Sequence, residues 1–272
     1  MIVSVCIPTY NGATYLRQAV DSVLSQTFTD FELLIVDDCS SDDTAQVVAG
    51  YSDPRIRFLR NQHNLGAQEN WNRCLAEARG RYFKLLPQDD VLAPACLARQ
   101  VDVLETDSAL SVALVFCART IVGNDGTPIM TRGYPGAQEG TLSARRILRS
   151  CVRRGTNLLG EPGGVLFRRD LAMRVGSFNA SEPYVIDLDY WWRLLANGDA
   201  YYLSESLVSF RISRQSWSVA IGTRQAGEYQ RFIGRMMESS HVGATVMDRW
   251  TGALMARVNG LLRLVFYRLV LK

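Results

Sequence analysis

Residues 1–43 read MIVSVCIPTYNGATYLRQAVDSVLSQTFTDFELLIVDDCSSDD, and their apolar pattern changes period twice. Residues 2–7 are a short apolar run rich in β-branched side chains, and Pro8 ends it. Apolar residues then recur at helical spacing over residues 15–24, and a second apolar run covers residues 31–36. This segment therefore predicts a strand, a helix and a second strand.

The same alternation continues to about residue 105. Further strand-like runs cover residues 56–59 and 82–86, and helix-like segments cover residues 44–50, 66–79 and 94–105. Strands separated by helices predict βαβ units, and hence an α/β fold with a mostly parallel sheet. Ligands of such sheets bind beyond the carboxyl ends of the strands. We therefore expect the loops after the strands at 2–7, 31–36 and 82–86 to lie on one edge.

Beyond residue 105 the pattern is less regular. We predict a strand at 112–122, a helix at 187–197, short strands at 201–203 and 207–210, and mostly helix from residue 224. No internal repeat or low-complexity linker divides the chain. The pattern predicts one α/β domain over residues 1–218 and a helical C-terminal extension over residues 219–272.

Composition and charge narrow the class of protein. A net charge of +3 in 272 residues does not suggest a nucleic-acid binder, which carries a concentrated basic surface. The six cysteines lack zinc-ligand spacing, and a reduced compartment is the simpler interpretation. We see no signal peptide and no uncharged apolar run of ~20 residues, so we expect a cytoplasmic protein. Because there are only two histidines, a metal would be held mainly by carboxylates, which favours magnesium or manganese.

Two adjacent aspartates, Asp89 and Asp90, directly follow the strand predicted at residues 82–86. Neighbouring carboxylates are costly to keep ionised unless a positive group neutralises them. A divalent cation that also holds two phosphates would do so, because hard cations take carboxylate and phosphate oxygens together. The alternative, rated equally on this motif alone, is that Asp90 caps the next helix while Asp89 is solvated.

Asp37 and Asp38 end the strand predicted at residues 31–36. A carboxylate at this edge can accept a hydrogen bond from a base N–H or a ribose hydroxyl. Taken alone, turn formation is the better interpretation of this pair. At the same edge Tyr10, in the segment PTYN at residues 8–11, could stack on a nucleobase, although this segment alone is an ordinary strand–turn–helix connection.

Asp187 and Asp189 stand at the start of the Trp-rich helix predicted at residues 187–197. A helix N-terminus favours an ionised carboxylate, and a carboxylate in an apolar cleft is a usual general base. The alternative is an N-cap over a buried face that holds Trp191 and Trp192. For Asp189 we prefer the alternative.

Each motif is modest alone, but their order and spacing are far more specific. Over roughly residues 1–218 the chain resembles the family 2 inverting glycosyltransferases. The motifs that carry the resemblance are, in order, Pro8-Thr9-Tyr10-Asn11, Val36-Asp37-Asp38 with Ser40 and residues 42–44, Asn64-Leu65-Gly66, Asp89-Asp90, and Asp187-Leu188-Asp189-Tyr190-Trp191. The resemblance implies a GT-A fold, a nucleotide-diphosphate sugar as donor, often a UDP-sugar, and magnesium or manganese as cofactor.

Matching positions imply roles for individual residues. The resemblance places the following at the nucleotide or the donor: Pro8, Thr9, Tyr10, Asn11, Asp37, Asp38, Asn64, Gly66, Gln88 and Arg211. Asp89 and Asp90 occupy the DxD-like position that holds the metal and the diphosphate. Asp187 matches the usual catalytic base, which would deprotonate the acceptor hydroxyl.

The chain also departs from the family pattern. Pro87 stands where the DxD-like motif often begins with an aspartate, which leaves open whether Asp89 or Asp90 is the direct metal ligand. The histidine that follows an arginine in many relatives is absent, so Arg211 or Arg214 is expected at the diphosphate instead. The QxxRW element and membrane spans of processive relatives are not found, so we expect transfer of a single sugar.

The sequence leaves the acceptor open. A glycan or a lipid-linked saccharide is expected, as in cell-surface polysaccharide synthesis. Residues 161–164 and four aromatic residues could face it, although core packing is an equal alternative for the tryptophans: Tyr184, Tyr190, Trp191 and Trp192. Residues 249–272 carry five basic and no acidic side chains, so this helix could lie on the inner face of a membrane, or equally pack or dimerise.

Two other classes of protein could carry the same motifs. A nucleotidyltransferase needs a Gly-rich, basic loop early in the chain, whereas residues 8–12 hold one glycine and no Lys or Arg. A non-catalytic sugar- or nucleotide-binding module would not need Asp187 together with Asp89 and Asp90. Both rivals are therefore less favoured than a glycosyltransferase.

Overall fold

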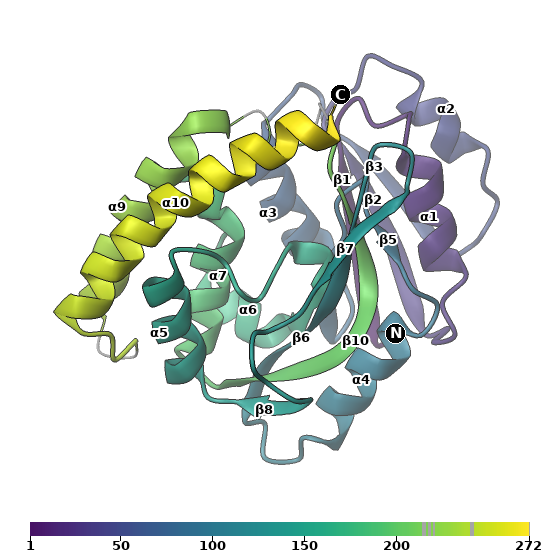
Figure 1. Cartoon of the computed structure of the whole chain (residues 1–272). Coiled ribbons are helices and arrows are strands. Elements are labelled where there is room, and N and C mark those ends of the chain that lie inside the picture. Colours follow the sequence, from purple (N-terminus) through teal and green to yellow (C-terminus); the bar gives the residue numbers. More distant parts are fainter. Residues whose placement is uncertain (214–215, 217–218, 220, 240–241, 272) are drawn as a thin grey trace.

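The computed structural model describes residues 1–272 except 214–215, 217–218, 220, 240–241 and 272 (Figure 1). The strands are β1 Val3–Thr9, β2 Phe31–Asp37, β3 Ile56–Arg60, β4 Tyr82–Leu85, β5 Val91–Leu92, β6 Val112–Val122, β7 Pro128–Arg132, β8 Gly140–Leu142, β9 Val165–Arg168 and β10 Asp199–Arg211. The helices are α1 Leu16–Leu24, α2 Thr44–Ala49, α3 Ala67–Glu77, α4 Cys96–Thr106, α5 Ala144–Arg154, α6 Arg169–Val175, α7 Ile186–Leu195, α9 Gln225–Met237 and α10 Val246–Val270. Short 3-10 helices are η1 Pro162–Gly164, η2 Pro183–Val185 and η3 Gly222–Arg224.

The first half of the chain forms four parallel strands, as its alternating pattern predicts. β1 pairs in parallel with β2 and with β4, and β2 pairs in parallel with β3. Thr9 at the end of β1 lies beside Asp37 at the end of β2. The loops that follow β1, β2 and β4 therefore meet at one edge of the sheet, where the predicted site residues lie.

The remaining strands extend this sheet and add antiparallel pairs at several positions, beside one further parallel pair between β6 and β10. The order is β3-β2-β1-β4-β9-β6-β10-β5, with β7 on β6 and β8 on β10. β9 is antiparallel to both of its neighbours, and β7 returns along β6 after a turn at residues 124–126. The two strands predicted at 201–203 and 207–210 are one strand, β10. The register of β10 against β6 shifts between Leu203 and Val208, and residues 204–206 are exposed there, which explains why the apolar pattern is interrupted.

Two apolar cores cover opposite faces of the sheet, because successive side chains of a strand point to opposite sides. Val3, Val5 and Ile7 of β1 belong to the core that includes residues of α1 and α4. Cys6 of the same strand belongs to the core that includes residues of α3, α5, α7 and α9. Figure 1 shows α1 and α4 on one side of the sheet and these other helices on its far side.

The C-terminal helices α9 and α10 pack onto the second core. Phe232 and Ile233 of α9 and Ala256 of α10 belong to the same cluster as Cys6 of β1. The predicted helical C-terminal region is therefore present, whereas the boundary between residues 218 and 219 stays a prediction. Within the described part of the chain, no helix combines the length and the apolar content that crossing a membrane requires.

Helix α5 was not predicted. Its sequence, ARRILRSCVRR, contains five arginines, so apolar side chains are a minority in this segment and their period is hard to recognise. The buried side chains nevertheless recur at helical spacing, as Ile147, Leu148, Cys151 and Val152. Ser143 caps the helix by accepting a hydrogen bond from the Arg146 amide, and Gly155 ends it in a left-handed conformation. α10 packs against the outer side of α5.

Candidate active site

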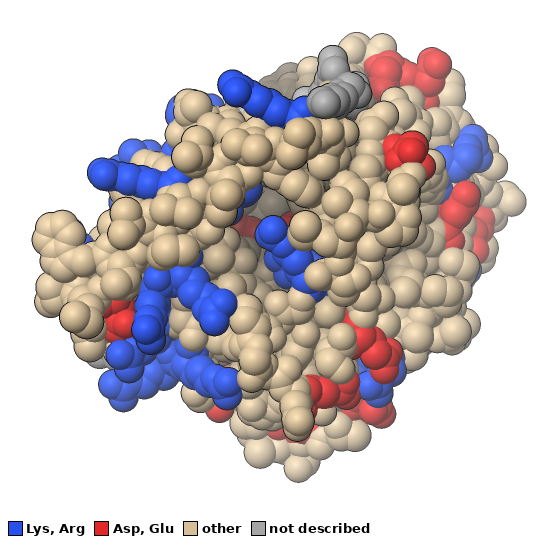
Figure 2. All heavy atoms as spheres, in the orientation of Figure 1, with Lys and Arg blue, Asp and Glu red and all other residues tan. Residues whose placement is uncertain are grey.

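A cavity of about 620 Å³ opens beyond the carboxyl ends of β1, β2 and β4. Figure 2 shows its mouth as a hollow beside α10. Most of the site residues expected from the sequence line it: Pro8, Thr9, Tyr10, Asp38, Asn64, Gly66, Gln88, Asp89 and Asp187. Asn11, Asp37, Asp90 and Arg211 do not line it. The predicted edge of the sheet therefore holds the candidate site.

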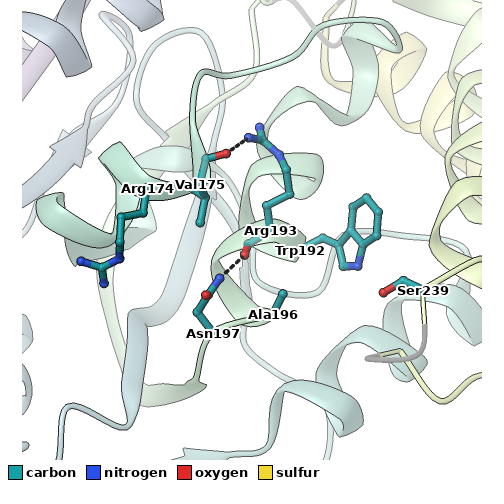
Figure 3. A pocket seen from close by; sticks show the side chains of 7 residues that line it. All are labelled: Arg174, Val175, Trp192, Arg193, Ala196, Asn197 and Ser239. Atoms are coloured by element: carbon teal, nitrogen blue, oxygen red, sulfur yellow. Dashed lines mark hydrogen bonds between the residues drawn. The ribbon is translucent and has the colours of Figure 1, made fainter.

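A second hollow, of about 380 Å³, lies between α6 and α7 (Figure 3). Its polar groups are engaged with one another, because Arg193 Nη1 donates to the carbonyl oxygen of Val175 and Asn197 Nδ2 donates to that of Arg193. None of the residues predicted for the nucleotide, the metal or the catalytic base lines it. Trp192, which the acceptor hypothesis placed at the site, lies here instead.

Gln88 joins the loop after β4 to the loop after β1. Its Oε1 accepts hydrogen bonds from Thr9 Oγ1 at 2.6 Å and from the Tyr10 amide at 2.9 Å. Its Nε2 donates to the Tyr10 carbonyl oxygen at 3.2 Å. A Cβ on Gly12 would collide with the Gln88 and Thr9 side chains, so the glycine permits this contact. The ring of Tyr10 stays half exposed at the cavity, where it can stack on a flat ligand.

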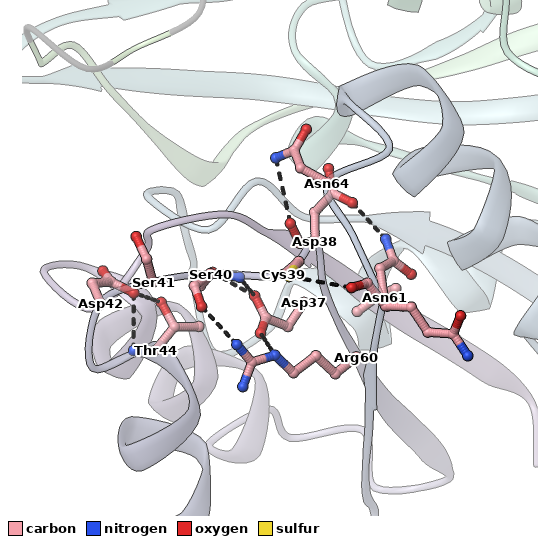
Figure 4. A network of polar contacts seen from close by, with 12 residues as sticks. Asp37, Asp38, Cys39, Ser40, Ser41, Asp42, Thr44, Arg60, Asn61 and Asn64 are labelled. Carbon is pink, nitrogen blue, oxygen red and sulfur yellow. Dashed lines mark hydrogen bonds and ion pairs between the residues drawn. The ribbon is translucent and has the colours of Figure 1, made fainter.

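Asp37 is not among the residues that line the cavity, and its side chain is turned toward Ser40 and Arg60 (Figure 4). Its Oδ1 accepts hydrogen bonds from the Ser40 amide at 3.1 Å and from the Ser40 hydroxyl, and its Oδ2 lies 3.3 Å from Arg60 Nε. The side chain is fully buried. The contacts of Asp37 therefore agree with turn formation, the alternative considered for this pair. Both carboxylate oxygens are engaged by groups of the protein itself.

Asp38 turns the other way and lines the cavity (Figure 4). Its Oδ1 accepts from Asn61 Nδ2 at 2.6 Å and from the Leu65 amide at 2.8 Å. Its Oδ2 accepts from the Gly66 amide at 2.9 Å. Asp38 therefore holds the turn at residues 64–66, and Gly66 suits that turn because its φ is +83°. Asn64 closes the turn by accepting from the Gly66 amide at 3.1 Å.

Asn11 also serves the loops rather than the cavity. Its backbone has a φ of +47°, and its amide donates to Ser40 Oγ at 2.8 Å. Its side-chain Oδ1 accepts from the Ser41 amide at 2.9 Å. Asn11 thus fixes the loop after β1 against the loop after β2, next to the cavity-lining Tyr10.

Asp89 and Asp90 differ sharply in their surroundings. Asp89 lines the cavity, whereas Asp90 is fully buried. Asp90 Oδ1 accepts from the Arg211 amide at 3.0 Å, and its Oδ2 has no hydrogen-bond partner in the described part of the chain. Burial raises the pKa of both carboxyl groups, and the charge of Asp89 together with that of Glu161 raises the pKa of Asp90 further. The positive charge near Asp89 and Asp90 is therefore too small to offset the cost of ionising both carboxyl groups.

Asp89 and Asp90 fit a metal ion whose other coordination positions are filled by a bound ligand. Within the residues that the structure describes, no group of three or more His, Cys, Asp or Glu side chains is arranged to hold a metal ion. Asp89 and Asp90 supply hard oxygen donors but not a complete coordination shell. A magnesium or manganese ion that takes further oxygens from a diphosphate and from water would complete the shell and neutralise the pair.

Arg211 lies behind the aspartate pair. Its Nε donates to the carbonyl oxygen of Asp89 at 3.0 Å, its Nη1 to that of Asn124 at 2.9 Å, and its Nη2 to Gln18 Oε1 at 2.7 Å. The guanidinium also stacks on the ring of Tyr15, 4.6 Å from its centre. These contacts position the aspartates and leave the guanidinium outside the cavity lining. The other expected arginine, at residue 214, lies outside the described residues.

Asp187 lies at the start of α7 and faces the cavity. Its Oδ2 accepts from Asn157 Nδ2 at 3.0 Å, and its Oδ1 accepts from the Leu188 amide at 2.6 Å. Burial raises the pKa of this carboxyl to about 7, against the lowering effect of the Leu188 amide. A carboxyl that titrates near neutral pH inside a cavity is suited to take a proton from a hydroxyl group.

Arg119 and Glu161 form a buried ion pair in the cavity wall, with 2.5 Å between Arg119 Nε and Glu161 Oε2. A Cβ on Gly160 would lie 2.9 Å from Arg119 Nη1, so the glycine leaves room for the guanidinium. The negative charge of Glu161 also raises the pKa of Asp187. Arg119 was not predicted, because it lies inside a long strand with no motif around it.

The C-terminal helix α10 lines the cavity with Arg263, Phe266 and Tyr267, although the sequence placed it outside the domain that holds the site. Arg263 Nε donates to Gln225 Oε1 at 2.8 Å, and its guanidinium lies 5.1 Å from the centre of the Tyr184 ring. Of the aromatic residues expected at the acceptor, Tyr184 lines the cavity. Tyr190 and Trp191 are buried in the core.

Residues 4–176 match the family model described as glycosyl transferase family 2. The chain belongs to this family. It is 32% identical over 212 residues to an uncharacterised protein of Mycobacterium tuberculosis, a match that covers 76% of this chain and 66% of that protein. It is 28% identical to a putative teichuronic acid biosynthesis glycosyltransferase, TuaG, of Bacillus subtilis, over 88% of this chain and 90% of TuaG.

Solved structures of glycosyltransferases share the fold. Residues 1–349 of TarS of S. aureus in complex with UDP-GlcNAc superpose with a TM-score of 0.66 at 18% identity, over 97% of this chain and 73% of that TarS fragment. The mannosyltransferase PcManGT of Pyrobaculum calidifontis, solved with GDP-Man and Mn2+, gives 0.67 at 16% identity, over 97% and 73%. The GT-A fold that the sequence resemblance implied is therefore confirmed, with the helical C-terminal region included. The family match over residues 4–176 and the likeness to TuaG make the chain a glycosyltransferase.

Proposed function

We propose that this glycosyltransferase transfers a single sugar, with inversion, from a nucleotide-diphosphate sugar to a hydroxyl group of a saccharide acceptor. The observation that carries the proposal is that Asp89 and Asp187 line one cavity while the pKa of Asp187 is raised to about 7. One carboxylate can hold a metal-bound diphosphate, and the other can take a proton near neutral pH.

The nucleotide half of the donor lies, on this proposal, at the ends of β1 and β2. Tyr10 stacks on the base, because its half-exposed ring is fixed through the amide and carbonyl contacts with Gln88. Asp38 and the turn at residues 64–66 supply polar groups to the ribose side. UDP is the first choice of nucleotide, and because PcManGT was solved with GDP-Man, GDP is the second.

Asp89 is the direct metal ligand in this proposal, and Asp90 positions it. Asp89 reaches the cavity, whereas Asp90 is buried and accepts the Arg211 amide. A bound magnesium or manganese ion supplies positive charge that makes the diphosphate a better leaving group. The manganese in the PcManGT complex supports a metal of this class.

Asp187 acts as the general base. Asn157 and the Leu188 amide orient its carboxylate, which accepts the acceptor proton as the acceptor oxygen attacks the anomeric carbon. Attack from the face opposite the diphosphate gives inversion in one displacement through an oxocarbenium-like transition state. The relation to TuaG, which is named for teichuronic acid biosynthesis, supports a polysaccharide or its lipid-linked precursor as acceptor.

The test is thermal stabilisation by UDP, GDP and other nucleoside diphosphates, with and without manganese. Wild-type protein should be stabilised by one nucleotide preferentially and only with metal, and Asp89→Asn should lose that effect. Asp187→Asn is the matched control, because it neutralises a cavity carboxylate that does not hold the metal in this proposal. Equal loss in both variants, or no stabilisation by any nucleotide, would contradict the assignment.

A further inference from the structure

Helix α10 turns a stripe of large apolar side chains to solvent. Met247, Trp250, Leu254, Leu261 and Leu269 are between 62% and 76% exposed. Their spacing of mostly three, four or seven residues keeps them along one side of the helix. Exposed apolar surface of this extent marks an interaction site, because single exposed apolar residues are ordinary but a continuous stripe is not.

The opposite side of α10 is made of small residues that press on α5. A Cβ on Gly252 would collide with the carbonyl oxygen of Val152, and Gly155 at the end of α5 meets the backbone of Ala256 equally closely. Gly260, on the same side, is also buried. A helix on the surface of a water-soluble protein usually buries its large apolar residues. α10 does the reverse, so its apolar side is available to a partner.

A band of arginines borders the stripe. All five arginines of α5 are exposed, and α10 adds three more exposed ones: Arg145, Arg146, Arg149, Arg153, Arg154, Arg249, Arg257 and Arg268. The single acidic residue of the two helices, Asp248, is buried against Thr245 and Arg149. Figure 2 shows the basic side chains gathered over α5, beside the mostly uncharged surface of α10. The apolar side chains suit the acyl-chain layer of a bilayer, and the arginines beside them suit anionic headgroups. Together they fit the surface of an anionic lipid bilayer.

We propose that α10 lies along the surface of an anionic bilayer, with its stripe in the interface and the arginines of α5 and α10 at the lipid headgroups. A second copy of the chain fits less well, because pairing two such faces would bring their arginines together. The residues that line the cavity from α10, Arg263, Phe266 and Tyr267, belong to the same helix. Because the cavity mouth opens beside α10 (Figure 2), docking of this helix keeps the mouth next to the membrane surface, and, resting on the proposed function, the acceptor saccharide is carried on a lipid.

The test is flotation of the whole chain with vesicles of phosphatidylcholine, with and without phosphatidylglycerol. Wild-type protein should bind the anionic vesicles, fail to bind the neutral ones, and dissociate at high salt. A double substitution in the stripe, Trp250→Glu with Leu254→Glu, should weaken partitioning by more than about tenfold, because each side chain loses its apolar burial. Arg153→Glu with Arg154→Glu should remove the preference for anionic vesicles. Met173→Glu is the matched control, because Met173 is an exposed apolar residue on α6, outside the stripe.

Two results would overturn docking: no binding to anionic vesicles, or equal binding by the wild type and the stripe variant. A wild-type dimer that the stripe substitutions dissociate, without vesicle binding, would assign the face to self-association and also reject the proposal. Stabilisation by a nucleoside diphosphate with manganese, measured on the same samples, reports the donor site separately. Vesicle binding without nucleotide stabilisation would leave docking standing and reject the proposed function.

Discussion

The side-chain amide of Asn157 donates one hydrogen bond to Asp187 Oδ2 at 3.0 Å and a second to the carbonyl oxygen of Gly160 at 2.9 Å. The same side chain accepts the Leu159 amide at its Oδ1. Asn157 is thus fixed within its own loop and presents an N–H to the carboxylate. This contact lowers the pKa of Asp187 against the larger effect of burial, so it tunes as well as orients the proposed base.

Asn157→Ala removes that donor, and we expect the pKa of Asp187 to rise. The acid limb of the pH profile of kcat/KM should move to higher pH, with a loss of about three- to tenfold at pH 6 and a smaller loss at pH 8. The measurement is kcat/KM across this range with the donor fixed. A uniform loss at every pH would indicate that Asn157 only supports the loop.

Asp187→Asn removes the proposed base while keeping its shape. Turnover should fall by roughly two to four orders of magnitude, because positioned proton transfer contributes that much. Donor binding should survive, since Asp187 lies at the acceptor side of the cavity in the proposed mechanism. Isothermal titration with the nucleotide and manganese checks this, and a comparable loss of nucleotide affinity would count against the base assignment.

The raised pKa of Asp187 also predicts how stability depends on pH. Its usual value is about 3.9, and its folded value is about 7, so the folded protein binds more protons than the unfolded chain between these values. The contribution of Asp187 to stability is therefore present at about pH 4 and is lost as pH rises through about 7.

Asp187→Asn carries no such charge, so it should be more stable than the wild type at pH 8 by on the order of 1–3 kcal/mol. At pH 4 the two proteins should unfold alike. Urea denaturation at the two pH values measures the difference. A variant that is less stable than the wild type at pH 8 would show that the Asp187 charge is well compensated.

Asp89→Asn and Asp90→Asn separate the two members of the aspartate pair. We expect Asp89→Asn to abolish stabilisation by nucleotide and manganese, because only Asp89 lines the cavity. Asp90→Asn should keep part of it, since an asparagine oxygen can still accept the Arg211 amide. Thermal shifts measured over a manganese titration give the comparison. The reverse ranking would make Asp90 the direct ligand.

The sequence predicts the sheet edge well because local patterns determine it. The runs at residues 2–7, 31–36 and 82–86 become parallel strands, so their following loops must meet. Asp37 and Asp38 show the limit of this reasoning. Which of two adjacent carboxylates faces the cavity depends on partners such as Arg60 and Asn61, which are far along the chain from the motif.

Other cavity residues leave no local signal. Asn157 lies in an irregular loop, and its role is visible only through its contact with Asp187. Arg263 reaches the cavity because α10 folds back over α5 and α9, a long-range packing that periodicity does not reveal. The same packing explains why the sequence pattern places α10 outside the domain with the site although the helix supplies part of the cavity wall.

Gly252→Ala tests whether α10 is held by close contact of small residues. An added Cβ would meet the Val152 carbonyl oxygen, which is backbone and cannot rotate away, so α10 has to shift outward. We expect a loss of stability of about 1–3 kcal/mol, as for other overpacked sites. Gly234→Ala on α9 is the control, because nothing lies within 4 Å of its added Cβ and alanine favours a helix by up to about 1 kcal/mol. Denaturant unfolding of both variants measures the difference in stability. If Gly252→Ala is as stable as Gly234→Ala, close packing of small residues does not hold α10 in place against the cavity.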